Sequence, residues 1–281
     1  NGPNQVVNLT ETNMTTQNYS FGGAISFKII RQLMVMTSAE RAVRLPEANE
    51  IFGIVAENII ANPELKPERS DNFNFGIEFN PDLPKHNVIF RPNIFIRNTN
   101  DLILRYNQGG YDQNLVSGNI GKVFTKGVDA EIMYSYKRWL MFAVNGSIFD
   151  AQIHNTTLDP VSGEPVLTNK SRLPNTPYFT INSNFRIERP SLFAKGDLFI
   201  FHYNFLYVHE FLRRGTGLGG AGQTFIPTQM THDTGVAYTF PKVRFTVSFD
   251  VRNIFNAQLF DNFALQKPGR GFYVKLTYSI F

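Results

Sequence analysis

The chain has 281 residues, a formal net charge of +4, only 18% charged residues and no cysteine. The lack of cysteine excludes disulfides, cysteine-ligated metal sites and thiol nucleophiles, and a small net charge without a clustered Lys/Arg face argues against nucleic acid as a partner. No apolar run approaches the roughly 18 residues of a membrane-spanning helix, so the chain could cross a membrane only as strands.

In the first half of the chain, apolar and polar side chains alternate with the two-residue period of a β-strand. The segments with this pattern are residues 19–29, 33–41, 70–80, 87–106 and 122–136. Pro92 lies inside the fourth segment and cannot donate a ladder hydrogen bond, so it predicts a bulge or bend there. A short helical turn is expected at residues 47–52, in the loop that precedes residue 70.

The same alternation continues to the end of the chain. Its segments are residues 139–149, 178–187, 192–203, 229–240, 243–252 and 271–281. The last two are the clearest, because every second residue is apolar from Val243 to Val251 and again from Phe272 to Ile280. The chain therefore contains about eleven strands, and their connections alternate between tight turns and much longer polar loops.

Alternation alone fits two folds. A soluble antiparallel sheet turns its apolar face to a core, whereas a transmembrane barrel turns it to lipid and keeps a polar face toward its lumen. Ordinary strands average about 5–6 residues, while a tilted strand that crosses a bilayer needs roughly 9–11, and many of these run about ten or more. Long loops at one end and tight turns at the other are typical of outer-membrane barrels. The sequence therefore predicts an all-β fold, a transmembrane antiparallel β-barrel, with a soluble β-rich binding or adhesion module as the weaker alternative.

No pattern of side chains indicates an enzyme. The histidines are scattered, and His202 and His209 are seven residues apart, which is not a metal-ligand spacing. Asp129 and Glu131 share one strand face and could imitate an acid–base pair, but a polar lumen explains them equally well. The glycine-rich residues 215–222 lack the Lys-Ser/Thr of a phosphate-binding loop. We expect no catalytic residue, no metal and no cofactor.

Motifs spread along most of the chain resemble those of the TonB-dependent outer-membrane receptors, with the general character of members from the Bacteroidetes. The motifs lie in residues 44–52 (RLP and NEIF), 62–70 (NPELKPERS), 119–131 (NIG to KGVDAE), 172–177 (RLPNTP) and 253–270 (NIFN to PGR). Each is weak alone, and their order carries the resemblance. It implies that residues 1–281 are the C-terminal half of the barrel, about the last eleven strands of a 22-stranded plugged barrel, with the plug and N-terminal strands upstream.

The resemblance also implies a function. Such a receptor is an active transporter of the bacterial outer membrane that imports a scarce nutrient such as an iron chelate, cobalamin, a glycan or a peptide. Its partners would be outer-membrane lipid, TonB through a segment upstream of residue 1, the barrel-assembly machinery and, in some systems, a surface lipoprotein lid. A passive porin-like channel is the alternative function. The fold does not fix the ligand, so the substrate is not readable from these residues.

Three groups of residues carry further expectations from the resemblance. A loop-ordering or plug-contacting role is expected for Arg44, Pro46, Asn62, Pro63, Lys66, Pro67 and Glu68. A substrate vestibule near the loop tips is expected to include Tyr106, Tyr111, Phe260 and Phe263. An assembly signal is expected at Tyr278 and the terminal Phe281, although Phe281 is out of phase with the apolar face that Tyr278 and Ile280 share.

Overall fold

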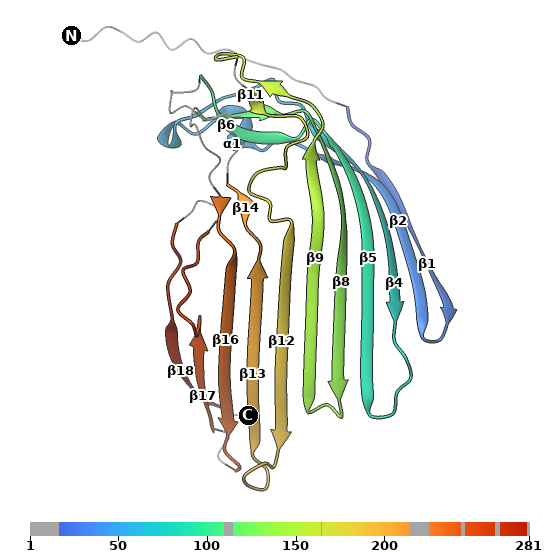
Figure 1. Ribbon diagram of the computed structural model, residues 1–281, viewed down its shortest axis with the longest axis vertical. Coiled ribbons are helices and arrows are strands. Elements are labelled where there is room, and N and C mark those ends of the chain that lie inside the picture. The colour runs from blue at the N-terminus through green and yellow to red at the C-terminus, as the bar shows by residue number, and fades with distance from the viewer. Residues whose placement is uncertain are drawn as a thin grey trace, which may run out of the picture.

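One antiparallel sheet of eleven strands dominates the computed structural model, which describes residues 17–109, 115–163, 165–213, 225–242, 245–261 and 265–279. The strands follow one another in chain order, with β1 and β18 at the two edges. Figure 1 shows them side by side as a curved wall. The predicted all-β fold and the predicted eleven strands are confirmed.

The strands of this sheet are long. Their bounds are β1 Phe21–Ile30, β2 Leu33–Arg44, β4 Glu68–Phe79, β5 His86–Asn100, β8 Lys122–Tyr136, β9 Leu140–Ile153, β12 Phe179–Pro190, β13 Leu198–Val208, β16 Gln229–Thr239, β17 Phe245–Arg252 and β18 Gly271–Tyr278. All except β17 and β18 have at least ten residues. This is the length that a tilted strand needs to cross a bilayer.

The two ends of the sheet differ. At the short-turn end, tight turns join β1 to β2, β4 to β5, β8 to β9, β12 to β13 and β16 to β17. At the long-loop end, the connections carry small elements of their own. These are α1 (Ala48–Phe52), η1 (Val55–Glu57), β3 (Ile59–Ile60), β6 (Ile103–Asn107), β7 (Leu115–Asn119), β10 (Thr157–Leu158), β11 (Pro165–Leu167), β14 (Phe211–Leu212) and β15 (Phe225–Ile226). In Figure 1, α1, β6 and β11 lie together above the long strands, while β14 lies lower, directly above β13. The helical turn predicted at residues 47–52 is confirmed by α1. Within the described ranges, no helix is long and apolar enough to span a membrane.

The pairing register gives the sheet one apolar and one polar face. Phe75 pairs with Thr37 on one side and with Ile94 on the other, and Ile94 pairs with Val128, so these four share a face. This apolar face is not covered by other described residues, since Phe73 is 47% exposed and Ile94 51%. The large apolar side chains of this face therefore do not lie in a dry protein core. The barrel interpretation requires this arrangement, because it places these side chains against lipid.

The strand predicted at residues 87–106 ends earlier than expected. Asp101 follows β5 with φ of 57°, a left-handed conformation that a short polar side chain tolerates and that ends the extended run. The chain then enters β6, which belongs to a separate three-stranded sheet with β3 and β7. The bulge predicted at Pro92 is wrong, because the β4–β5 register is the same at Gly76–Asn93 and at Phe79–Phe90.

The strand predicted at residues 192–203 starts later, at Leu198. The preceding residues form a turn around the Asp197 carboxylate, which is 2% exposed. It accepts the backbone N–H groups of Leu192, Phe193 and Ala194 at 2.8, 3.0 and 2.7 Å. A carboxylate that satisfies three backbone donors stabilises the turn in place of a strand ladder.

On the polar face, β8 passes between two aromatic rings at Gly127. The rings of Phe95 and Phe149 have centroids 6.2 Å apart, and a Cβ on Gly127 would overlap Phe149 Cβ and lie 2.6 Å from Phe95 Cζ.

We predict that Gly127→Val in the full receptor lowers the free energy of unfolding by about 1–3 kcal/mol through overpacking. The loss of stability is measured as the urea concentration at which half of the protein has lost its folded band on unheated gels. Gly23→Val is the control, because its Cβ would meet no atom within 4 Å; equal midpoints for the two variants would refute the prediction.

Candidate functional site

Arg44 is the centre of an ion-pair cluster that links three elements at the long-loop end. Its guanidinium lies 3.1 Å from Glu50 Oε2 in α1 and 2.7 Å from Glu68 Oε1 at the start of β4. The same Glu68 oxygen accepts the backbone N–H of Ile103 at 2.7 Å. Hydrogen bonds between charged groups are stronger than neutral ones, and the Glu68 side chain is only 14% exposed. This ion-pair cluster therefore fixes α1, β4 and β6 relative to one another.

Two of the sequence motifs lie against each other. Asn62 Nδ2 donates to the carbonyl of Ser117 at 2.8 Å. The Asn119 side chain accepts the backbone N–H of Lys66 and donates back to the Lys66 carbonyl, both at 2.8 Å. It also donates to the carbonyl of Asp101 at 2.8 Å. The loop at residues 62–67 is thus hydrogen-bonded to β7. The sequence motifs do not predict this contact, because it joins residues 53 positions apart.

The remaining motif residues have different surroundings. Pro67 is buried, Pro46 is half-buried and Pro63 is exposed. The side chain of Lys66 is exposed, and only its backbone takes part in the hydrogen bonds to Asn119. The structure therefore brings together Arg44, Glu68, Asn62 and the Lys66 backbone within the connected loops, while Pro46 and Pro63 lie at their surface.

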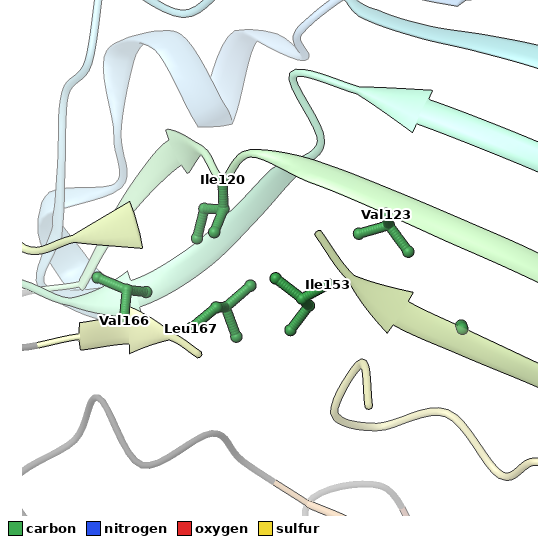
Figure 2. Close-up of a cluster of buried hydrophobic side chains, with 6 residues drawn as sticks. Ile120, Val123, Ile153, Val166 and Leu167 are labelled. Atoms are coloured by element: carbon green, nitrogen blue, oxygen red, sulfur yellow. The ribbon is translucent and has the colours of Figure 1, made fainter. Parts of the chain in front are cut away.

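An apolar cluster folds the long loops over the polar face. Its buried members are Ile120, Val123, Ala151, Ile153, Val166 and Leu167, most of which Figure 2 labels. Val123 and Ile153 are paired residues on the side of β8 and β9 that also carries Asp129 and Ser147. Ile120 follows β7, and Val166 and Leu167 belong to β11. The loops after β5 and β9 consequently pack over the polar face at the long-loop end instead of extending away from the sheet, and we call them the loop layer.

Asp159 stabilises the loop layer through its charge. It is 2% exposed, and its carboxylate accepts the backbone N–H groups of Gly109 and Val161 at 2.6 and 2.9 Å and the Ser162 hydroxyl at 2.9 Å. Burial opposes the charge, but these hydrogen bonds outweigh it and hold the pKa of Asp159 below its ordinary value. Burial also raises the pKa of Tyr106, and the nearby charge of Asp159 adds to that shift.

Of the four residues expected to form a vestibule, the structure describes Tyr106 and Phe260. Tyr106 is half-buried and packs against the apolar cluster. Its ring lies over Gly118, so a Cβ added at Gly118 would be 2.8 Å from the ring. Phe260 lies between β17 and β18, where its N–H donates to Gln229 Oε1 at 2.7 Å. These two connections are attached to strands that are well separated in the sheet order. Tyr111 and Phe263 lie outside the described residues.

Of the two residues of the expected assembly signal, the structure describes only Tyr278. Tyr278 ends β18, is 66% exposed and shares the apolar face with its pairing partner Phe245. Phe281 lies outside the described residues.

The polar face carries ion pairs near β5. Arg91 lies 2.8 Å from Glu78 and 3.1 Å from Glu131, which bridges β4, β5 and β8. Six residues further along β5, Arg97 donates to Asn72, which donates to Glu40 at 3.0 Å. This half of the wall is therefore charged, and its charges are largely paired within the sheet.

Further along, the polar face becomes a row of amides. Asn145 accepts from Asn182 at 3.3 Å, and Asn184 donates to Asn204 at 2.5 Å. Beyond them His202 lies 3.1 Å from Asp250 across Gly235 of β16, where a Cβ would overlap the Asp250 carboxylate. The described residues hold no group of three or more side chains suited to bind a metal ion. The face is thus a hydrogen-bonding wall.

Removing the charge of Glu68 should loosen the ion-pair cluster. We predict that Glu68→Gln in the full receptor costs about 1–3 kcal/mol of local stability, because Arg44 loses a charged partner. Hydrogen exchange at the Ile103 amide, which donates to Glu68, reports the loss. Glu64→Gln is the control, since Glu64 is exposed in the same loop. Equal exchange rates in both variants would argue against this role of Glu68.

The depressed pKa of Asp159 makes loop order depend on pH. Because the folded pKa lies below the unfolded value of about 3.9, the stabilisation is complete above that value and is lost as pH falls through the folded pKa. We predict that protection factors of the Gly109 and Val161 amides are constant from pH 7 to about 4 and fall below it. Asp159→Asn should lower them by about tenfold at pH 7 and remove the acid transition. A transition that persists in Asp159→Asn would assign it to another group.

Comparison with known proteins places this geometry in a family. The family described as "TonB dependent receptor-like, beta-barrel" matches residues 1–254. No curated protein matches the sequence. Among solved structures, the siderophore receptor PirA from Acinetobacter baumannii superposes with a TM-score of 0.66 at 19% identity, over 93% of this chain and 41% of that one.

Two further structures have the same architecture. The copper transporter OprC gives a TM-score of 0.66 at 15% identity, over 90% of this chain and 38% of its own. The ferric yersiniabactin uptake receptor FyuA from Yersinia pestis gives 0.61 at 16% identity, over 90% and 35%. At these identities the likeness shows the fold, and the chain spans about two fifths of the length of PirA. The family match over residues 1–254 shows that this chain belongs to the β-barrel family of the TonB-dependent receptors.

Proposed function

We propose that this chain is the C-terminal half of the barrel of a TonB-dependent importer of the bacterial outer membrane. The observation that carries the proposal is an antiparallel sheet of eleven long strands with a bare apolar face and a polar face, in a chain of this family. Both edge strands lack a partner on one side within the described residues. A membrane sheet must pair its edges, and this supports further strands from a larger barrel.

The two faces suggest how the wall works. The apolar face would contact lipid, and the polar face would line the lumen. With the short-turn end toward the periplasm, the loop layer lies on the outside, above the lumen. We propose that the Arg44 cluster and the Asn62–Asn119 contacts keep the loops in place for ligand entry, with Tyr106 and Phe260 near the entrance. The barrel supplies the wall, while a plug and a TonB-contacting segment from elsewhere in the protein would couple transport to energy.

The ligand class follows only by analogy. The structural neighbours include siderophore, ferric enterobactin and ferric yersiniabactin receptors and a copper transporter. We therefore propose a chelated metal as the first ligand to test, ahead of cobalamin, glycans and peptides. A passive porin-like channel is the second candidate. The family match favours the importer.

Uptake in a receptor-deletion strain tests the proposal. With the full-length receptor restored, accumulation of a labelled ferric siderophore should appear, and it should vanish in a strain that lacks TonB or after a protonophore collapses the proton gradient. Uptake that survives both treatments would indicate a passive channel instead. Growth on a panel of iron chelates, cobalamin, glycans and peptides then identifies the ligand independently of the energy requirement.

A further inference from the structure

Basic side chains without carboxylate partners collect at the short-turn end. We call them the rim cations: Lys85, Lys137, Arg138, Arg189, Lys195 and Lys242, each exposed and each without an ion pair to any residue that the structure describes. They come from four successive turns of the sheet, those before β5, β9, β13 and β17. This end of the wall therefore presents uncompensated positive charge.

The acidic residues of the same turns are already engaged. Asp197 accepts three backbone N–H groups and the hydroxyl of Tyr238 at 2.9 Å. Asp82 accepts Gln32 at 2.9 Å and lies 3.6 Å from Arg31. Glu188 is paired with Arg186 at 2.9 Å. Asp82 and Glu188 are thus paired with cations other than the rim cations, and the charge of Asp197, whose donors are neutral, offsets only one of the six rim cations.

Two rim cations are held against aromatic rings at the border of the apolar face. Lys137 Nζ lies 5.2 Å from the ring centroid of Tyr136, and the Arg189 guanidinium lies 4.5 Å from that of Trp139. Tyr136 and Trp139 are themselves in edge contact at 5.7 Å. By register, Tyr136 and Arg189 point to the side of the sheet that carries the apolar residues. The charges therefore lie where a bilayer would meet water.

Backbone hydrogen bonds fasten these turns to one another. The N–H of Lys137 donates to the carbonyl of Lys85 at 2.9 Å, and the N–H of Glu188 donates to that of Trp139 at 2.7 Å. Lys85, Lys137 and Arg189 are thus placed on adjoining strand ends by the main chain. The cations do not have to be brought together at an entropic cost when a ligand binds.

The long-loop end has cation–ring contacts both with and without a carboxylate partner. Arg41 lies over Phe21 at 5.6 Å and Arg172 over Tyr178 at 4.0 Å. Each of these arginines also has a carboxylate, Asp71 at 2.6 Å and Asp150 at 3.0 Å respectively. Arg252 over Tyr273 at 5.1 Å and Arg270 over Phe272 at 5.8 Å have no ion pair to a described residue. Stacked cations without a carboxylate therefore occur at both ends, and what sets the rim cations apart is that backbone hydrogen bonds place several of them on neighbouring strand ends.

We propose that the short-turn rim is a binding site for the phosphate of anionic glycerophospholipids. Lys and Arg beside a membrane surface attract anionic lipid, and the N–H groups of a stacked guanidinium remain available to phosphate oxygens. An acidic protein is a poorer fit, because Lys137 and Arg189 lie on the lipid-facing side and not below the rim. The inference needs the barrel to lie in a membrane, but it does not depend on which solute is imported.

Trp139 is the only tryptophan of this chain and lies under Arg189, so its fluorescence reports on the lipid beside it. The full receptor is placed in nanodiscs of phosphatidylcholine that contain a fixed fraction of one brominated lipid, either phosphatidylglycerol or phosphatidylcholine. Subtraction of the Trp139→Phe signal isolates the emission of Trp139. Stronger quenching by brominated phosphatidylglycerol at equal fraction is expected. Equal quenching by the two lipids would overturn the proposal and leave an acidic protein as the partner to seek.

A charge variant supplies the second measurement. Lys137→Gln with Arg189→Gln should weaken phosphatidylglycerol binding by roughly tenfold in native mass spectrometry, since each cation near a membrane surface contributes severalfold. The matched control is Lys122→Gln with Lys126→Gln, which removes two exposed cations from the other end of β8. The folded band on unheated gels establishes that both variants assemble. The same loss of lipid in both, or in neither, would refute the site, whereas loss of siderophore uptake with lipid binding intact would concern the transport function alone.

Discussion

The structure depends on the need to pair every backbone N–H and C=O that lies in hydrocarbon. Lipid offers no hydrogen bonds, so a chain that crosses it as strands must build one continuous ladder. The eleven antiparallel strands do this without a crossover, each bonded to its neighbours in chain order. The side chains then have only two directions available, and the sequence assigns apolar residues to one and polar residues to the other.

That division also determines how the loops fold. The upper ends of β8 and β9 carry Val123, Ala151 and Ile153 on the face that is otherwise polar. These apolar side chains are shielded from water only because the connections around β7 and β11 pack onto them. A small hydrophobic core thus forms above the lumen, and the ion pairs of Arg44 and the hydrogen bonds of Asp159 lie around it. Membrane wall and loop layer are therefore stabilised by different forces, backbone pairing in one and local burial in the other.

The strands were predictable because their period is local. Alternation over residues 70–80 or 122–136 needs no knowledge of the partner strand, and β8 has the predicted bounds. The predictions fail where contacts outside the two-residue period decide the outcome. Asp197 keeps residues 192–194 out of the strand through its carboxylate, and Asp101 ends β5 through its backbone angle. The loop contacts of Asn119 join segments more than fifty residues apart, which no periodicity can reveal. The Arg44 and Glu68 motif residues could be named from the sequence, but their pairing required the fold.

The contact between Asn119 and residue 66 has a consequence for how such receptors diverge. The Asn119 carboxamide bonds only to the main-chain N–H and C=O of residue 66, as the backbone of a neighbouring strand would. It makes no hydrogen bond to the Lys66 side chain, which is exposed. The path of the loop therefore does not depend on which side chain residue 66 carries. Selection can replace the exposed lysine by any residue that tolerates the same backbone angles, and so change the side chain that this loop displays without redesigning its scaffold.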